Sequence, residues 1–370
     1  MANLWQDGCE IDFADNAAGL WTGFTENSSS LGDLAWVNTK ARTGSGSVRI
    51  YSTSNGISRY IYKTLPSTYT EVFVGVGVLW DSGSAFTEGH NGAGVQFLSL
   101  VSSASNIQIT MAIDTSTNVI RLYRGQINDN NLLGSGTTPI TADIFHYIEL
   151  NATINDTTGA ATVKVDGITD ITLTGIDTNT GTANVGTIRM GVLPSGNITF
   201  GGAAADFYFD DVVVNDTSGT VANSWPNQAG VQLLTPNADG NYTAWTSTGG
   251  AVDYTEVDDV AAWGGLPDGD TTHLSSATTG QRTSVGLTGV TGAGDVLGVM
   301  LLTNAASSVA TADTMNQFVR VNGTDYDSTA FSPGTSYAWR TDILTLNPDT
   351  SAAWTTAEIE TMELGWQRVT

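Results

Sequence analysis

Acidic side chains are the first candidates for chemistry in this sequence, because carboxylate oxygens serve both calcium binding and acid–base catalysis. Asp206 precedes the pair Asp210 and Asp211, and Asp268 stands two residues before Asp270. Neither group shows the spaced ligands and closing Glu of an EF-hand loop. Asp-rich segments usually act as turns and caps, which is the interpretation we favour. The weak candidates for a structural calcium site are Asp210, Asp211, Asp268 and Asp270.

Other catalytic and cofactor patterns are missing from the sequence. The histidines, His90, His146 and His273, stand far apart, and none has a histidine partner at the spacing that zinc sites use. No Gly-x-Ser-x-Gly elbow, P-loop or dinucleotide-binding glycine motif occurs. The single Cys9 excludes an intramolecular disulfide framework. We therefore predict no catalytic residue and no cofactor, and expect a protein that is not an enzyme.

One short pattern does contain closely spaced carboxylates. The run from Glu10 through Asp12 to Asp15 resembles the Glu-x-Asp-x-x-Glu strand of laminarinase-type retaining glucanases. A retaining mechanism needs two carboxyl groups about 5–5.5 Å apart. Here the last position is the shorter Asp, and the pattern stands at the start of the chain, whereas in those enzymes it lies on a central strand. We favour a loop after the first strand, and rank glycan hydrolase last among the functions considered.

Aromatic side chains offer a second kind of chemistry, the stacking of sugar rings. Such a platform on one sheet face would use residues of the first third of the chain, namely Trp5, Trp21, Trp36, Trp80, Tyr51, Tyr60 and Tyr62. Aromatic residues are nevertheless mostly buried, and two sandwich cores would absorb about ten tryptophans. We predict that most of these side chains belong to the core.

The elements that would position these residues are strands. Apolar and polar residues alternate from about Ser47 to Phe209, with a hairpin over 107–113 and 119–123 and a tight turn at Asp166-Gly167. Residues 71–80 read as one long buried strand. Roughly ten to twelve strands joined by polar turns indicate an antiparallel β-sandwich.

The alternation stops near 215–230, where polar residues and Trp225-Pro226-Asn227 predict a linker. A second set of strands is expected from Val231 onward, with candidates at 284–290, 295–303, 316–321 and 339–344. Thr355-Thr356-Ala357-Glu358 has the form of a capping box and predicts a short helix that continues toward Leu364. The expected organisation is a sandwich over 1–216, a linker over 217–230 and a second, jelly-roll-like sandwich over 231–370. The predicted fold class is all-β.

Charge excludes several classes of partner. The chain has 370 residues, with 37 acidic against 13 basic side chains and a net charge of −24. A nucleic-acid binder or a protein that binds anionic membranes needs a basic face, which this chain lacks. The 40% of hydrophobic residues argues against disorder. No signal peptide is visible at the N-terminus, so we expect synthesis in the bacterial cytoplasm.

Two resemblances add to this interpretation. The opening Asp7-Gly8-x-Glu10, the middle Val165-Asp166-Gly167 and the closing run over 207–214 resemble the concanavalin A-like, laminin-G-type sandwich. The second half looks like a module of tailed-bacteriophage virion proteins, with Leu234-Thr235-Pro236-Asn237 and the tail over 347–365 in the same order. Asn347 and Ser351 depart from the Asp and Gly expected there.

The phage resemblance implies a structural component of the virion, such as a capsid decoration, head fibre or tail appendage. Its expected partners are the major capsid or tail proteins, and it would stand on the outer surface of the particle. Closed symmetry on a particle favours a homo-oligomer, most plausibly a trimer. We expect the C-terminal domain to anchor. The alternative is an adhesin whose first sandwich binds host surface glycans, and the two functions are compatible in a host-adhesion fibre.

Overall fold

The chain forms two compact units in the computed structural model. The structure describes residues 2–11, 20–26, 32–52, 59–83, 94–114, 116–192, 205–250, 252–260, 265–292, 294–309 and 313–370. The first unit comprises Met1–Cys9 and Trp21–Val231, and the second comprises Glu10–Leu20 and Gln232–Thr370.

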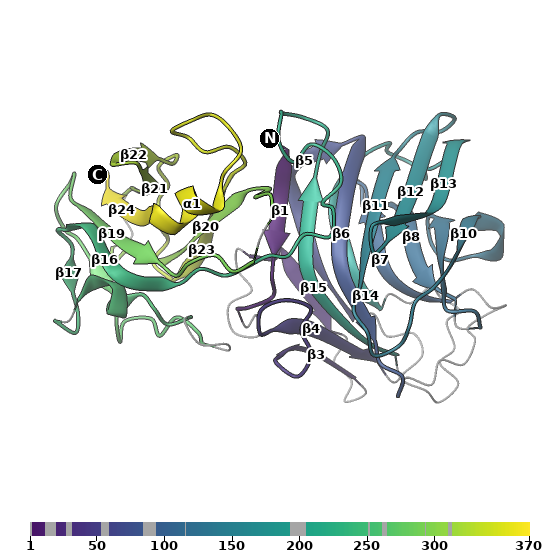
Figure 1. The fold of residues 1–370 in the computed structure, drawn as a ribbon, viewed down its shortest axis with the longest axis horizontal. Helices are drawn as coiled ribbons and strands as arrows, with labels where there is room; N and C mark the ends of the chain where they lie inside the picture. The colour runs from purple at the N-terminus through teal and green to yellow at the C-terminus, as the bar shows by residue number, and fades with distance from the viewer. Residues whose placement is uncertain are drawn as a thin grey trace. The chain divides into compact units, whose positions relative to one another are not determined.

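The first unit is built from two antiparallel sheets that lie in two layers (Figure 1). The eight-stranded sheet contains, in order, β13 (Ile168–Ile176), β12 (Gly159–Val165), β11 (His146–Thr153), β6 (Glu71–Trp80), β15 (Ala205–Asn215), β4 (Ser47–Ser52) and β3 (Gly32–Val37), with β1 (Asn3–Asp7) paired to β15. The seven-stranded sheet contains β10 (Leu132–Pro139), β9 (Val119–Arg124), β8 (Ile107–Ile113), β7 (Val95–Val101), β14 (Val185–Val192), β5 (Arg59–Tyr69) and β2 (Gly23–Glu26).

The core of this unit lies between the two sheets. Phe97 on β7 and Phe207 on β15 meet across the layers, with ring centroids 6.3 Å apart. β6 is the long buried strand that the sequence predicts, because its residues from Val72 to Trp80 are all buried. The Asp166-Gly167 turn also forms as expected, and both residues have the positive φ that such a two-residue hairpin turn requires. The all-β sandwich prediction is confirmed.

A β-bulge interrupts β15 between Asp210 and Val213, and it carries two buried carboxylates. Asp211 adopts a φ of 49° at this bulge. Asp210 Oδ2 accepts hydrogen bonds from the backbone N–H groups of Arg42 (2.6 Å) and Thr43 (3.1 Å). Asp211 Oδ2 pairs with the Arg42 guanidinium at 2.6 Å, and its Oδ1 accepts from the Thr43 hydroxyl. The bulge therefore fixes the 40–43 segment over the centre of the eight-stranded sheet.

The two ends of the first unit meet at the same strand. β1 pairs with β15, and the Val231 N–H donates to Asp211 Oδ1 at 2.7 Å. Gly8 lies so close to Val231 that a Cβ there would come within 2.3 Å of the Val231 carbonyl oxygen. The residues expected to form a linker contact this unit as well, since Trp225 packs on Phe73 with ring centroids 5.4 Å apart.

The second unit is a smaller β structure. Its five-stranded sheet contains β16 (Pro236–Thr243), β19 (Arg282–Leu287), β24 (Glu363–Arg368), β21 (Met315–Val321) and β22 (Thr324–Asp327). Two further antiparallel pairs are β17 (Thr246–Ser247) with β18 (Leu274–Ser275), and β20 (Val299–Ala305) with β23 (Ala338–Leu344). The predicted strand at Val231–Leu234 is wrong, because the first strand of this unit begins at Pro236. Pro is tolerated at that position, the first residue of a strand.

The predicted capping box is present. α1 (Thr356–Thr361) begins after Thr355, whose hydroxyl accepts from the Glu358 N–H while the Glu358 carboxylate accepts from the Thr355 N–H. Leu364 does not continue this helix but lies in β24, where it pairs with Val285 and Val319. None of the helices in the described ranges is both long enough and apolar enough to cross a membrane.

The buried pair on β15 predicts a pH dependence of stability. Burial and the neighbouring Asp211 carboxylate raise the pKa of Asp210 from its ordinary 3.8 to about 8. Folded Asp210 therefore holds a proton that the unfolded chain releases, and the free energy of unfolding falls as pH rises from about 4 to about 8. Asp210→Asn should weaken this slope in calorimetric unfolding, whereas Asp295→Asn, at an exposed position, should leave it unchanged. An Asp210→Asn slope equal to that of the parent protein would contradict this assignment.

Candidate functional site

The acidic residues singled out in the sequence are engaged by protein donors. Asp206 pairs with Arg49 at 2.6 Å, and Asp210 and Asp211 hold the 40–43 segment as described. Asp268 accepts from the N–H and hydroxyl of Thr272, and Asp270 accepts from the Tyr337 hydroxyl at 3.0 Å. Within the described ranges, no three His, Cys, Asp or Glu side chains gather as metal ligands would. Protein contacts therefore account for these carboxylates, and calcium stays a weak hypothesis.

The other sequence candidates are scattered. Asp12 and Asp15 of the glucanase-like pattern lie outside the described residues, as does His90. His146 Nδ1 contacts Asp166 Oδ2 at 2.7 Å, while its Nε2 accepts from the Thr141 N–H. His273 lies in the second unit. His146 and His273, the two described histidines, therefore belong to different units.

The aromatic residues separate into two groups. Trp5, Trp21, Trp36 and Trp80 are all buried, with exposed fractions of 1–8%. The prediction that they belong to the core is confirmed. Tyr60 and Tyr62 are instead half-buried on the outer face of β5, because they alternate with the buried Ile61. Only these two tyrosines of the predicted platform enter the candidate site described next.

A row of polar side chains crosses the outer face of the seven-stranded sheet. The strand registers set one residue from each of five neighbouring strands side by side. The row consists of Tyr62, Arg189, Ser99, Thr110 and Tyr123. Buried apolar residues occupy the alternate positions of these strands, such as Ile188 and Leu122, and face the core.

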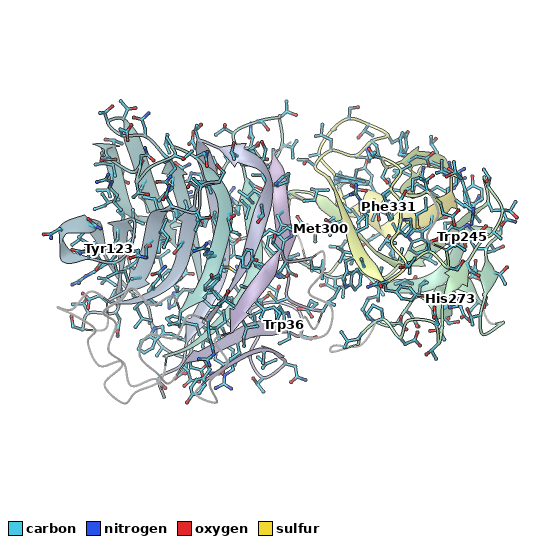
Figure 2. All side chains as sticks on the ribbon, turned by 180° about the vertical axis from the view of Figure 1, so that it is seen from behind. Trp36, Tyr123, Trp245, His273, Met300 and Phe331 are labelled. Carbon is cyan, nitrogen blue, oxygen red and sulfur yellow. The ribbon has the colours of Figure 1, made fainter. Side chains whose placement is uncertain are left out.

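One end of this row is closed over. Tyr123, near the β10 edge of the sheet (Figure 2), packs with Ala112 and with Ile127 of the segment that follows β9. Thr110 donates to the Gly125 carbonyl at 2.7 Å, and Gln96 donates to the Ser99 hydroxyl. The three polar members at this end are therefore buried and satisfied, and only the Tyr62–Arg189 end is available to a ligand.

The open end is a groove of about 560 Å³ between β2, β5, β7 and β14. Its floor holds Tyr60 and Tyr62, whose ring centroids are 6.1 Å apart, with planes inclined by 56°. The Tyr62 ring lies across Gly23, where a Cβ would come within 2.8 Å of the Tyr62 hydroxyl oxygen. Serine and threonine hydroxyls line the rest, at Thr25, Ser102 and Thr187 among others. This combination of tilted rings and hydroxyls suits a polyhydroxylated ligand.

Arg189 is the charged group of the groove. Its guanidinium carbon lies 5.2 Å from the centroid of the Tyr60 ring, and its Nε is buried without a hydrogen-bond partner. Nine of the 13 Lys and Arg side chains form ion pairs, but no Asp or Glu in the described part of the chain pairs with Arg189. In a chain of net charge −24, a cation left without a carboxylate is available to an anionic ligand.

The sequence does contain a signal for Arg189. The alternation expected up to Phe209 includes 187–193, where it places Thr187 and Arg189 on one face, and cations are scarce in this chain. What alternation cannot say is whether that face lies inside or outside.

Comparison with known proteins gives similarity of fold at low identity. No family model matches the sequence, and no curated protein does. Similar solved structures include the cellulose-induced protein Cip1 (14% identity, 57% of this chain and 94% of that chain, TM-score 0.38) and alginate lyase Aly36B (13%, 56% and 95%, 0.38). The carbohydrate esterase of Shiga toxin-encoding bacteriophage phi24B is another (14%, 53% and 91%, 0.37). Similarity at this level transfers no activity or residue role to this chain.

The comparison does correct one expectation. The prediction that the protein is not an enzyme is contradicted, because the similar structures include alginate lyases, one solved with an alginate tetrasaccharide, and a carbohydrate esterase. The physical reason is that a sandwich fold supports both binding and catalysis, so missing motifs do not exclude chemistry. The similar structures are carbohydrate-binding or carbohydrate-active β-sandwich proteins, and a virion role stays a prediction.

Two arginines of the same outer face should respond differently to substitution. Arg121 pairs with Asp114, which is fully buried, so Arg121→Gln should lower the free energy of unfolding by about 2 kcal/mol. Arg189→Gln loses only the contact with the Tyr60 ring, and should cost no more than about 0.5–1 kcal/mol. Urea unfolding of both variants checks this. Equal losses would mean that Arg189 has a structural role instead.

Proposed function

We propose that the first unit binds an acidic glycan in the groove formed by Tyr60, Tyr62 and Arg189. The single observation that carries the proposal is the Arg189 guanidinium, which lies beside two tyrosine rings and pairs with no carboxylate among the described residues. A sugar carboxylate would supply that partner through charge-assisted hydrogen bonds. The tyrosine rings would contact the apolar face of the sugar, and the surrounding hydroxyls would bond its hydroxyl groups.

The charge of the rest of the protein supports this choice of ligand chemistry. A net charge of −24 repels polyanions at long range, so an acidic glycan needs a local cation to be held. Salt screens the long-range repulsion over about 10 Å at 0.1 M, and it also weakens the contact with Arg189. Specific binding should therefore depend on one arginine and not on a broad basic surface.

Binding is tested with the full chain and an oligogalacturonate, using the methyl-esterified oligosaccharide as the uncharged match. We expect calorimetric titration to detect binding of the oligogalacturonate and much weaker binding of its methyl ester. Arg189→Gln should lower affinity about tenfold or more, because a hydrogen bond to a charged group is lost. Tyr62→Ala should lower it by a smaller factor. Oligoalginate and a sialylated oligosaccharide extend the panel to other acidic sugars.

Lys164→Gln is the matched control, because Lys164 lies over the Trp225 ring, outside the groove, and also lacks an ion pair among the described residues. It should leave affinity unchanged. No binding to any acidic glycan, or equal binding of acid and ester, would refute the proposal. The same samples are followed for the ultraviolet absorbance of an unsaturated uronate, which a lyase would form, and for methanol, which an esterase would release from the methyl ester. These two readouts distinguish binding from processing.

We also propose, from the resemblance of the second half to phage virion modules, that the protein belongs to a bacteriophage particle. In this arrangement residues 232–370 dock on a capsid or tail protein, and the first unit presents its groove on the outer surface as a homo-oligomer. Glycan binding by the first unit would then serve attachment to the host. The order of motifs in the second half and the groove of the first unit support this proposal.

Deletion of residues 232–370 tests this placement. The deletion begins after Val231, because residues 225–231 pack on the first unit and are needed there. We expect the parent chain in purified particles by mass spectrometry and the truncated chain only in the unassembled fraction. Retention of the truncated chain in particles would overturn the assigned polarity. Absence of the parent chain from particles would overturn the virion role and leave the glycan proposal untouched.

A further inference from the structure

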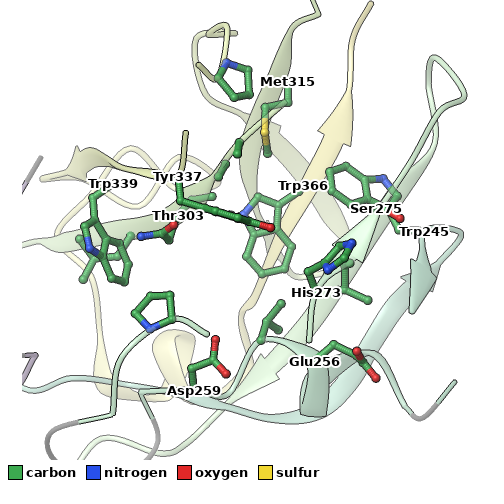
Figure 3. A pocket seen from close by; sticks show the side chains of 18 of the residues that line it. Trp245, Glu256, Asp259, His273, Ser275, Thr303, Met315, Tyr337, Trp339 and Trp366 are labelled. Carbon is green, nitrogen blue, oxygen red and sulfur yellow. The ribbon is translucent and has the colours of Figure 1, made fainter. Parts of the chain in front are cut away.

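The second unit contains a cavity of about 700 Å³ that the proposed glycan groove does not involve. This volume falls within the roughly 300–1,000 Å³ typical of small-molecule sites. Three tryptophans and a tyrosine line it, and Figure 3 shows Tyr337, Trp366 and His273 near its centre, with Trp339 on one side and Trp245 on the other. The cavity therefore presents several flat apolar surfaces to an occupant.

Most of these aromatic side chains have their polar ends fixed by the protein. Trp245 Nε1 donates to the Gln281 carbonyl at 3.1 Å, and Trp366 Nε1 donates to the Thr303 hydroxyl at 2.7 Å. Tyr337 donates to Asp270. These contacts hold the rings in place and leave their faces as the surface of the cavity.

A second set of lining groups makes no hydrogen bond to the described residues. Asn304 and Trp339 stand opposite each other on β20 and β23, so their side chains project on the same side of the hairpin. Trp339 Nε1, both polar atoms of the Asn304 side chain, and His273 Nδ1 are buried and have no hydrogen-bond partner in the part of the chain that the structure describes. Buried polar groups are normally satisfied, and a cluster of unsatisfied groups beside a cavity indicates a ligand that supplies the missing partners.

The chemistry of these groups selects the ligand. Asn304 needs both a donor and an acceptor, and Trp339 needs an acceptor, which a hydroxylated ligand provides. A quaternary ammonium ion would suit the aromatic rings but would leave these four atoms of Asn304, Trp339 and His273 unpaired.

Charge narrows the ligand further. The carboxylates of Glu256, Asp259, Asp270 and Asp313 line the cavity, and the Arg368 guanidinium is already paired with Asp313 at 2.9 Å. Burial, together with the nearby Asp268 carboxylate, raises the pKa of Asp259, so the protein already disfavours additional negative charge here. An anionic ligand would meet that repulsion.

We propose that this cavity binds a neutral sugar ring, stacked on the tryptophan faces and hydrogen-bonded by Asn304, Trp339 and His273. The site is separate from the acidic-glycan groove and does not depend on it. The chain would then hold two carbohydrate sites, one for an acidic sugar and one for a neutral sugar.

The test titrates the full chain with neutral oligosaccharides of glucose, galactose, mannose and N-acetylglucosamine, followed by calorimetry and tryptophan fluorescence. We expect saturable binding of at least one of them. Trp339→Phe keeps an aromatic ring but removes the N–H, and should weaken binding about five- to tenfold; Asn304→Ala should weaken it more. Trp225→Phe, which removes an indole outside the cavity, should leave affinity unchanged.

Several outcomes would overturn the proposal. The first is that no neutral sugar binds saturably. The second is that, in the Arg189→Gln variant, tetramethylammonium or galacturonate binds more strongly than any neutral sugar. The third is that Trp339→Phe and Asn304→Ala both keep full affinity. Near-ultraviolet circular dichroism checks that each variant is folded. If one of the two variants does not fold, the other still tests the cavity. Because Arg189→Gln removes only acidic-glycan binding, failure of the groove and failure of the cavity give different results.

Discussion

The buried carboxylate pair at the β15 bulge is the constraint on which the first unit depends. Asp210 and Asp211 lie on the strand that pairs with β6, β4 and β1, so any charge placed there must be satisfied within the sheet. The backbone N–H of Arg42 donates to Asp210, and the Arg42 guanidinium pairs with Asp211. The Val231 N–H donates to Asp211 as well. Desolvation makes an unpaired carboxylate costly, which explains why the start and end of the unit converge on this point.

The scarcity of cationic side chains in this chain also sets Arg189 of the groove apart. Arginine and lysine number only 13 against 37 acids, and most are committed to a carboxylate, as Arg42 is to Asp211 and Arg121 to Asp114. Arg189 differs because its guanidinium lies over the ring of Tyr60 and pairs with no described carboxylate. In the second unit, carboxylates line an aromatic cavity and would repel an anionic occupant. The same excess of acidic residues therefore supports different ligands for the two proposed sites.

Prediction from the sequence succeeded where a local rule was sufficient. The Thr355–Glu358 capping box and the Asp166-Gly167 turn depend on neighbouring residues, and both form as expected. It failed where distant packing decides: Val231–Leu234 is not a strand, and Leu364 belongs to β24 because Val285 and Val319 pair with it there. The exclusion of enzymatic activity was wrong for a related reason, since motifs and fold class do not define a site.

By itself, the sequence determined that the chain is all-β, because alternation with period two and turn residues are local properties of the backbone. Only the tertiary structure decided which face of each strand meets water and which charges find partners. Alternation places Tyr60 and Tyr62 on one face of their strand without saying whether that face meets water, and the register of two distant strands sets Arg189 beside Tyr62. Arg42 likewise meets an acid 169 residues away. Both sites arise from those long-range choices, because burial and ion pairing are set by residues that the sequence does not place together.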